Sequence, residues 1–279
     1  KAAESASRVE TMLRSLAVTV LLVGIEATFS RGGAIALLVG LAVLFGLTRH
    51  RRRLVGMLVC ALVGSGIAIA GLLPGIPESS KPHWVLAIGS LVLGLGAAAA
   101  LAVTLSSRAL LGWAVGAVGV GVLAGALFVP TMRHAAVAVA HPRLSPASSD
   151  RAHESSAALD QIRAHPLVGV GPGTQQLQWS GQDGAVYTDQ YAHDEYLQIA
   201  WKSGLVGLGL MLAMFVAIGR RIARGRIGLA SPGMWGGAVA GLAALATASG
   251  FDFLWHLPVI PLVGALLAGL SSNTEEQRS

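Results

Sequence analysis

Long apolar runs recur along this chain, and they constrain its fold more than any other feature. With their flanking residues, the runs approach the length of about 20 residues that a helix needs to cross a hydrocarbon layer. Only 12% of the residues are charged, against about 25% in an ordinary soluble domain, which leaves too little polar surface for a water-soluble chain. We therefore predict an all-α, polytopic transmembrane helical bundle of about eight spans, over residues 16–29, 34–47, 54–73, 84–105, 109–129, 204–219, 234–250 and 259–270.

Small residues dominate the apolar runs. Glycine occurs 36 times, whereas Phe, Trp and Tyr together make up 5% of the chain. Small side chains let transmembrane helices approach closely, because lipid provides no hydrophobic drive for helix pairing. The single cysteine, Cys60, lies inside an apolar run, and we interpret it as a small apolar packing residue.

Basic residues lie mainly at the ends of the apolar runs, as cytoplasmic anchors do. This placement argues against a nucleic-acid partner, despite the net charge of +6 and the pI near 10.2. With the basic block 49–53 in the cytoplasm, thirteen of the 20 Lys and Arg residues fall inside and seven outside. Arg31, a long polar loop and the turn at Asp252 then share the outer face. The predicted division is five spans over 1–129, the outer loop over 130–203, three spans over 204–271 and a cytoplasmic tail over 272–279.

The long polar loop contains two stretches with clear local preferences. Good helix formers and spaced apolar residues predict a short amphipathic helix over 150–164, lying at the membrane surface, with Arg151 and Arg163 on nearby faces. The next stretch, 165–173, reads HPLVGVGPG, and its two prolines and three glycines predict a rigid, tightly turning backbone. Its Gly-x-Gly-x-Gly spacing does not favour a nucleotide loop, because no strand precedes it and no βαβ unit surrounds it.

The main candidate for chemistry is the stretch 193–198, HDEYLQ, where the polar loop re-enters the membrane. A histidine with a pKa of about 6.5 can accept a hydroxyl proton near neutral pH. Asp194 and Glu195 lie beside His193 in the sequence and are candidates for raising its basicity or orienting it. Their spacing matches no strong metal-ligand pattern, so we predict no metal site and no cofactor. The alternative is that His193 caps the following helix and Tyr196 is an interfacial belt residue.

Four motifs follow one another along the chain. They are Ser-Arg-Gly at 30–32, Arg151 with a short helix leading into 165–173, Ala-His-Asp-Glu-Tyr-Leu-Gln at 192–198, and Ser-Gly-Leu-Val-Gly at 203–207. In their order, and in the long outer loop that holds two of them, they resemble the O-antigen ligase and O-antigen polymerase superfamily of membrane glycosyltransferases. Members of that family usually have more than eight spans, so we expect an N-terminal part to be absent from this chain.

The resemblance implies transfer of a glycan from a polyprenyl-diphosphate carrier to an acceptor hydroxyl, at the outer side of the bacterial inner membrane. The implied partners are the lipid-linked donor, membrane lipids and a glycan, lipid or protein acceptor. Transfer is expected to invert the anomeric carbon without a metal. The motifs do not distinguish a ligase from a polymerase, and they do not give the oligomeric state.

The resemblance also implies roles for individual residues. His193 is the expected base, and Arg31 and Arg151 are the expected ligands of the diphosphate, with Arg163 as a third. An arginine fork suits this task, since it stabilises the charge that gathers on a departing phosphate. The residues Glu195 and Tyr196, which share the motif of His193, are predicted to bind substrate.

Two other classes of protein remain open at this stage. One is a transporter or flippase for a lipid-linked or small substrate, in which Glu26, Asp252 and His256 would carry function from positions in or near the spans. Transporters usually show broken spans in paired halves, and we find no such pairing, which favours the enzyme. The other is a non-catalytic membrane scaffold, which would tolerate the loss of His193. Arg163 is equally well interpreted as a solvated helix charge.

Overall fold

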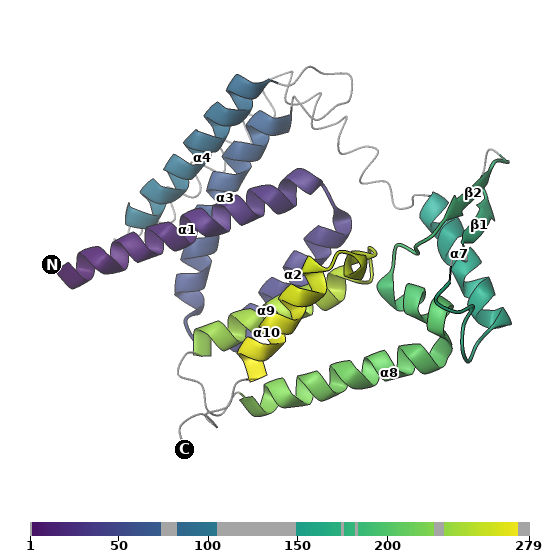
Figure 1. Cartoon of the computed structure of the whole chain (residues 1–279). Helices are drawn as coiled ribbons and strands as arrows, with labels where there is room; N and C mark the ends of the chain where they lie inside the picture. Colours follow the sequence, from purple (N-terminus) through teal and green to yellow (C-terminus); the bar gives the residue numbers. More distant parts are fainter. Residues whose placement is uncertain are drawn as a thin grey trace. The chain divides into compact units, whose positions relative to one another are not determined.

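The computed structural model describes residues 2–73, 83–104, 149–173, 176–181, 184–225 and 232–272 (Figure 1). The predicted span over 109–129 lies outside these residues. The chain divides into two compact units, Lys1–Arg31 with Arg49–Ser145, and Gly32–Thr48 with Pro146–Ser279. We call them the N-terminal unit and the C-terminal unit.

Three helices make up the described part of the N-terminal unit: α1 (Ala2–Thr28), α3 (Arg51–Leu72) and α4 (Trp84–Thr104). Each packs against the other two, because small residues let their backbones approach. At the contact of α3 with α4, a Cβ on Gly64 would press on the Gly94 carbonyl, and one on Gly71 would overlap the Ser90 side chain. The Ser90 hydroxyl donates to the Ala68 carbonyl at 3.1 Å. These contacts use small residues as the sequence predicts.

Two polar or reactive side chains of the N-terminal unit have packing roles. Glu26 of α1 accepts a hydrogen bond from the Ser65 hydroxyl of α3 at 2.9 Å, which gives this acid a partner on a neighbouring helix. Cys60 is 1% exposed and packs with Leu101 and Ala102. This environment agrees with the predicted packing role of the cysteine.

The described residues of the C-terminal unit include four apolar helices. They are α2 (Arg31–Leu47, whose first residue is assigned to the N-terminal unit), α8 (Glu195–Gly225), α9 (Pro232–Ala248) and α10 (Val259–Ser272). Helix α10 packs against both α8 and α9, and Gly40 of α2 lies against Ala244 of α9. Leu254–His256 form a short 3-10 helix, η2, and Leu257 is extended, as a residue before proline prefers.

Several of these helices have the length and composition of membrane spans. Within the described ranges, four are long and apolar enough to cross a bilayer, and three more are apolar but shorter. This confirms a helical membrane protein, while the number of eight spans stays a prediction. The four are Val9–Thr28, Arg51–Leu72, Trp84–Thr104 and Glu195–Arg224, and the three are Arg31–Leu47, Gly233–Ala248 and Val259–Ser272.

A small polar subdomain precedes α8 in the C-terminal unit. It consists of the predicted helix, α7 (Ser149–Ala164), and an antiparallel hairpin of β1 (Leu177–Ser180) and β2 (Val186–Asp189), which lie side by side in Figure 1. The hairpin was not predicted within the outer loop, although the fold as a whole is helical. Its cross-strand pair Trp179–Tyr187 stacks at 6.1 Å between ring centroids. The subdomain is held on α8 by a buried cluster of Ala158, Leu177, Ala192 and Trp201.

Helix α8 is interrupted at Gly204, whose φ of 68° and ψ of −174° are non-helical. The sequence predicts a helix core that begins at this glycine, but the helix begins nine residues earlier and resumes after the break. The backbone groups freed by the break pair with the rigid turn that follows α7. The N–H groups of Val170 and Gly171 donate to the carbonyls of Trp201 and Lys202, and those of Leu205 and Val206 donate to the carbonyls of Pro166 and Leu167.

Candidate active site

A buried carboxylate on α7 organises the candidate site. Glu154 is 4% exposed and lies one helical turn before Ala158, whose side chain is fully buried against the subdomain core. One carboxylate oxygen of Glu154 accepts the backbone N–H of His193 at 2.7 Å, and the other lies 2.9 Å from His193 Nδ1. Two contacts to one carboxylate fix both the backbone and the ring of His193.

The Glu154 contact determines what the ring of His193 can do. A carboxylate beside Nδ1 requires a proton on that nitrogen, so the neutral ring presents an unprotonated Nε2. The His193 side chain is 29% exposed, and the edge of its ring meets Phe253 at 5.2 Å between centroids. The geometry is that of an oriented base that a small hydroxyl compound can reach.

The two acids that follow His193 in the sequence have other partners, which corrects their predicted role in orienting the base. Asp194 caps α8, since its side chain accepts the N–H groups of Tyr196 (2.8 Å) and Leu197 (3.0 Å). The residue that caps α8 is therefore Asp194, not His193 as the alternative interpretation proposed. Glu195 is 2% exposed and turns toward the C-terminal end of α9 and the turn beyond it.

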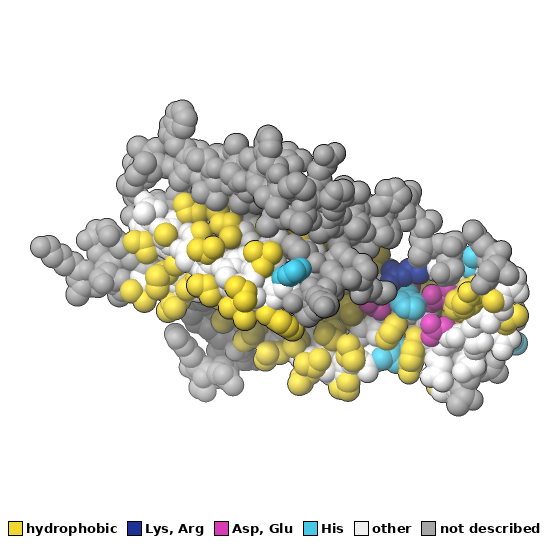
Figure 2. Space-filling view, turned by 90° about the horizontal axis from the view of Figure 1, so that it is seen from above, with side chains coloured by type: hydrophobic (Ala, Val, Ile, Leu, Met, Phe, Trp, Pro, Cys, Tyr) yellow, Lys and Arg dark blue, Asp and Glu magenta, His cyan; other side chains and the backbone are white. Residues whose placement is uncertain are grey.

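The turn Phe251–His256, which we call the C-terminal turn, meets the polar subdomain on one side of the site. Arg151 donates from its guanidinium to the Phe251 carbonyl at 3.5 Å. Arg151 lies three residues before Glu154, so both side chains leave the same side of α7. Figure 2 shows acidic, basic and histidine side chains gathered in one part of the face that it displays. Arg151, Glu154 and His193 are therefore brought together around this turn.

Glu195 and His256 form a second carboxylate–histidine pair at the same turn. Glu195 accepts the backbone N–H of Trp255, and one of its oxygens lies 3.5 Å from His256 Nδ1. The ring of His256 also meets Tyr191 at 4.2 Å between centroids. Glu195 is predicted as a substrate-binding residue, but it is buried and its side chain contacts the C-terminal turn.

Two of the other predicted residues have structural partners. The Tyr196 hydroxyl donates to the Ala246 carbonyl at 2.6 Å, which ties the start of α8 to the end of α9. Arg163 pairs with Asp160 at 2.8 Å, and both side chains are mostly exposed. It follows Glu154 by nine residues, about half a turn around the helix. The structure therefore does not bring Arg163 to the face of α7 that carries the site.

Arg31 is the first residue of α2. The next residue, Gly32, lies so close to Phe251 that an added Cβ would overlap that side chain. The chain that follows Arg31 is thus fixed against the C-terminal turn.

The sequence reasoning missed Glu154 as a site residue, and it missed the pairing of Glu195 with His256. A usable signal existed for Glu154, because its position three residues after Arg151 places both on one side of the predicted helix. No comparable signal exists for the second pair, whose members are 61 positions apart in the sequence. Among the described residues, no group of three or more His, Cys, Asp or Glu side chains is arranged to hold a metal ion.

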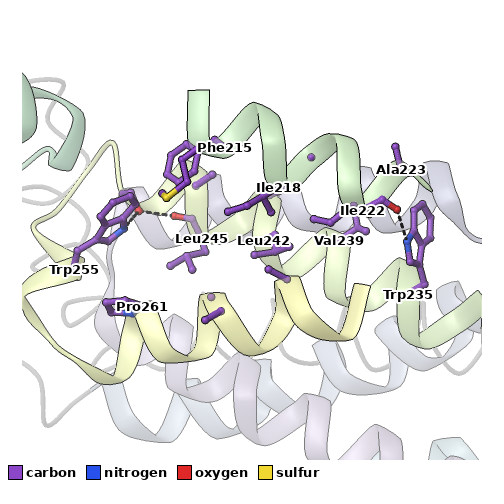
Figure 3. Close-up of a pocket in the computed structure, with 18 residues that line it drawn as sticks. Phe215, Ile218, Ile222, Ala223, Trp235, Val239, Leu242, Leu245, Trp255 and Pro261 are labelled. Carbon is purple, nitrogen blue, oxygen red and sulfur yellow. Dashed lines mark hydrogen bonds between the residues drawn. The ribbon is translucent and has the colours of Figure 1, made fainter. Parts of the chain in front are cut away.

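An apolar groove of about 740 Å³ runs between α8, α9 and α10 (Figure 3). One end is closed by the Trp235 indole, which donates to the Ile222 carbonyl at 3.3 Å, and the other by Trp255, which donates to the Ser249 hydroxyl at 2.9 Å. The apolar side chains of Ile218, Val239 and Leu242 lie between these ends in Figure 3. Trp235 and Ser249 are fourteen residues apart, so the groove follows α9 for about 20 Å.

These features define a helical membrane protein with a polar histidine site at one end of its apolar helices. Residues 86–212 match the family model for O-antigen ligase, and this match supports the O-antigen ligase family for this part of the chain. The matched segment contains Arg151, Glu154, His193 and Gly204 but ends before the C-terminal turn. The match suggests a membrane glycosyltransferase-like function, and that family implies a lipid-linked glycan and an acceptor as partners. No curated protein matches the chain.

Proposed function

We propose that this protein transfers a glycan from a polyprenyl-diphosphate carrier to the hydroxyl group of a glycan, lipid or protein acceptor. The reaction takes place at the outer face of the bacterial inner membrane. The observation that carries the proposal is the His193–Glu154 pair, because it presents an oriented basic nitrogen within a segment that matches the O-antigen ligase family.

In the proposed reaction His193 removes the proton of the acceptor hydroxyl. The acceptor oxygen bonds to the anomeric carbon of the donor as the bond from that carbon to the diphosphate breaks, and the electron pair leaves with the diphosphate. Attack from the side opposite the leaving group inverts the anomeric carbon. Glu154 stabilises the imidazolium that forms, in the way an orienting carboxylate does in other histidine-dependent enzymes. The proposed reaction needs no metal or other cofactor.

The departing diphosphate requires cations, since its negative charge grows as the sugar leaves. Arg151 is supported by its position at the C-terminal turn, one helical turn from the Glu154 that orients the base. Arg31 is proposed as a second ligand, because it directly precedes the glycine packed on Phe251. A fork of parallel N–H groups on each guanidinium matches the geometry of phosphate oxygens.

The apolar groove supports a lipid-linked donor. Its lining is almost entirely hydrocarbon, and its Trp255 end lies next to residues that belong to the polar site. A polyprenyl chain in the groove would remain in a lipid-like environment while its diphosphate end reached the C-terminal turn. A transfer reaction at the membrane surface needs this combination of an apolar channel and an adjoining charged site.

The test is glycan transfer from a polyprenyl-diphosphate donor by the purified protein in lipid nanodiscs. We expect His193→Ala to lower the rate by about 100-fold or more, since a positioned base contributes about 10²- to 10⁴-fold. The matched control is His50→Ala, which removes an exposed histidine from the start of α3 in the other unit. Transfer by His193→Ala at the wild-type rate, with the protein folded, would overturn the proposal.

A further inference from the structure

The pair of Glu195 with His256 is a second titratable cluster that the proposed reaction does not use. In its construction it resembles the His193–Glu154 pair, because in both a buried carboxylate faces Nδ1 of a partly exposed histidine. The side chain of Glu195 is 2% exposed and that of His256 is 35% exposed. With Nδ1 turned to the carboxylate, the Nε2 edge of this partly exposed ring is directed away from Glu195.

A purely structural role does not account for His256. Glu195 already holds the C-terminal turn, since it accepts the Trp255 backbone N–H and its own N–H donates to the Ser249 carbonyl at 2.8 Å. The separation of 3.5 Å between Glu195 and His256 Nδ1 is longer than an ordinary hydrogen bond. The histidine is therefore oriented by the carboxylate but is not needed to secure the turn.

The position of His256 fits the point where a lipid chain would end and its phosphate begin. Trp255 closes one end of the apolar groove, and His256 is the next residue. The His256 ring is 6.2 Å from Phe253 between centroids, and the same Phe253 ring meets His193. Neighbouring residues therefore connect the groove to His193, through Trp255, His256 and Phe253.

The order of these groups corresponds to the order of parts in a lipid-linked glycan, which are the apolar chain, the diphosphate and the first sugar. We propose that His256, held by Glu195, binds the carrier diphosphate on the side nearest the lipid chain as an imidazolium, whose Nδ1–H faces Glu195 and whose Nε2–H donates to a phosphate oxygen. This inference rests on the proposed function, because it takes the lipid diphosphate as donor. It makes His256 a donor-binding residue and leaves proton removal from the acceptor to His193.

The experiment measures equilibrium binding to the full chain in nanodiscs with two probes, decaprenyl diphosphate and the uncharged alcohol decaprenol. The proposal predicts that His256→Ala weakens diphosphate binding by about 10- to 100-fold, the range expected for a hydrogen bond to a charged group. Decaprenol binding should stay within about twofold of wild type, because the groove is intact. The His193→Ala protein should bind the diphosphate as wild type does, and His256→Arg, which keeps a cationic donor, should retain most of the affinity.

Three results would overturn the inference. Diphosphate binding by His256→Ala that equals wild type would show that the ring makes no such contact. An equal loss for decaprenol and for the diphosphate would show that the substitution damages the groove instead. If wild type itself binds the diphosphate no better than decaprenol, the donor class in the proposed function fails together with this inference. The first two outcomes leave the proposed function standing.

Discussion

The break in α8 gives the sharpest prediction about how this fold holds its site. Gly204 adopts a φ of 68° and a ψ of −174°, a region that is essentially restricted to glycine and costs other residues about 1–3 kcal/mol. An added methyl group would also overlap the Leu167 carbonyl. To avoid it, the turn must move away from α8 and give up some of its four backbone hydrogen bonds, each with a net contribution of about 1 kcal/mol. We expect Gly204→Ala to lower the free energy of unfolding by at least about 2 kcal/mol.

Two other glycines provide matched controls for Gly204→Ala. Gly209 lies in the same helix with open space around its Cα, so Gly209→Ala should be neutral or stabilising by up to about 1 kcal/mol. Gly171 has a φ of 89° but also open space, so Gly171→Ala should show backbone strain of about 1–2 kcal/mol without the overlap. Denaturant unfolding in detergent gives the order, and hydrogen exchange at the amides of 170–171 and 205–206 reports on the paired turn. If Gly204→Ala unfolds within about 0.5 kcal/mol of Gly209→Ala, the reasoning is refuted.

Three further predictions concern single side chains. Arg151→Ala should lower the rate of glycan transfer by about 10- to 100-fold. Arg163→Ala breaks only an exposed ion pair and should change the rate by less than about twofold. Equal losses in the two variants would contradict the assignment of Arg151 as a diphosphate ligand. Tyr196→Phe should lower the free energy of unfolding by about 1 kcal/mol, because it leaves the Ala246 carbonyl unpaired. Thermal unfolding measures this loss, and unchanged stability would count against the contact. Glu26→Gln keeps an acceptor for the Ser65 hydroxyl and should leave the rate of glycan transfer unchanged. Abolished transfer would contradict the packing role assigned to Glu26.

The membrane class and most helix positions were readable from the sequence because hydrocarbon imposes a strong length requirement. The predicted runs at 54–73 and 84–105 differ from α3 and α4 by a few residues at most. The helix over 150–164 was also found, because its composition favours a helix. The hairpin was missed, since two strands of four residues carry almost no periodic signal.

The site was predictable where local sequence decides it and not where tertiary contacts do. The motifs nominated His193 and Arg151 as candidate site residues, and the prolines and glycines at 165–173 predicted the rigid turn. The sequence analysis proposed the adjacent acids as partners of His193. Adjacency in sequence does not predict side-chain contacts at a helix cap, where the side chains turn in different directions. Asp194 is used by the first turn of α8, and Glu154 reaches His193 only because α7 docks through Ala158.

The central claim is that Glu154 and His193 act as one catalytic unit, and a double-mutant cycle tests it most directly. Glu154→Gln keeps an acceptor for the His193 N–H but can place an amide donor beside Nδ1, which favours the tautomer with its proton on Nε2. We expect this change alone to lower the transfer rate by more than about tenfold. Added to His193→Ala, it should lower the remaining rate by less than about twofold, because residues that act as a unit are not additive. A double variant whose loss is the product of the two single losses would contradict the account.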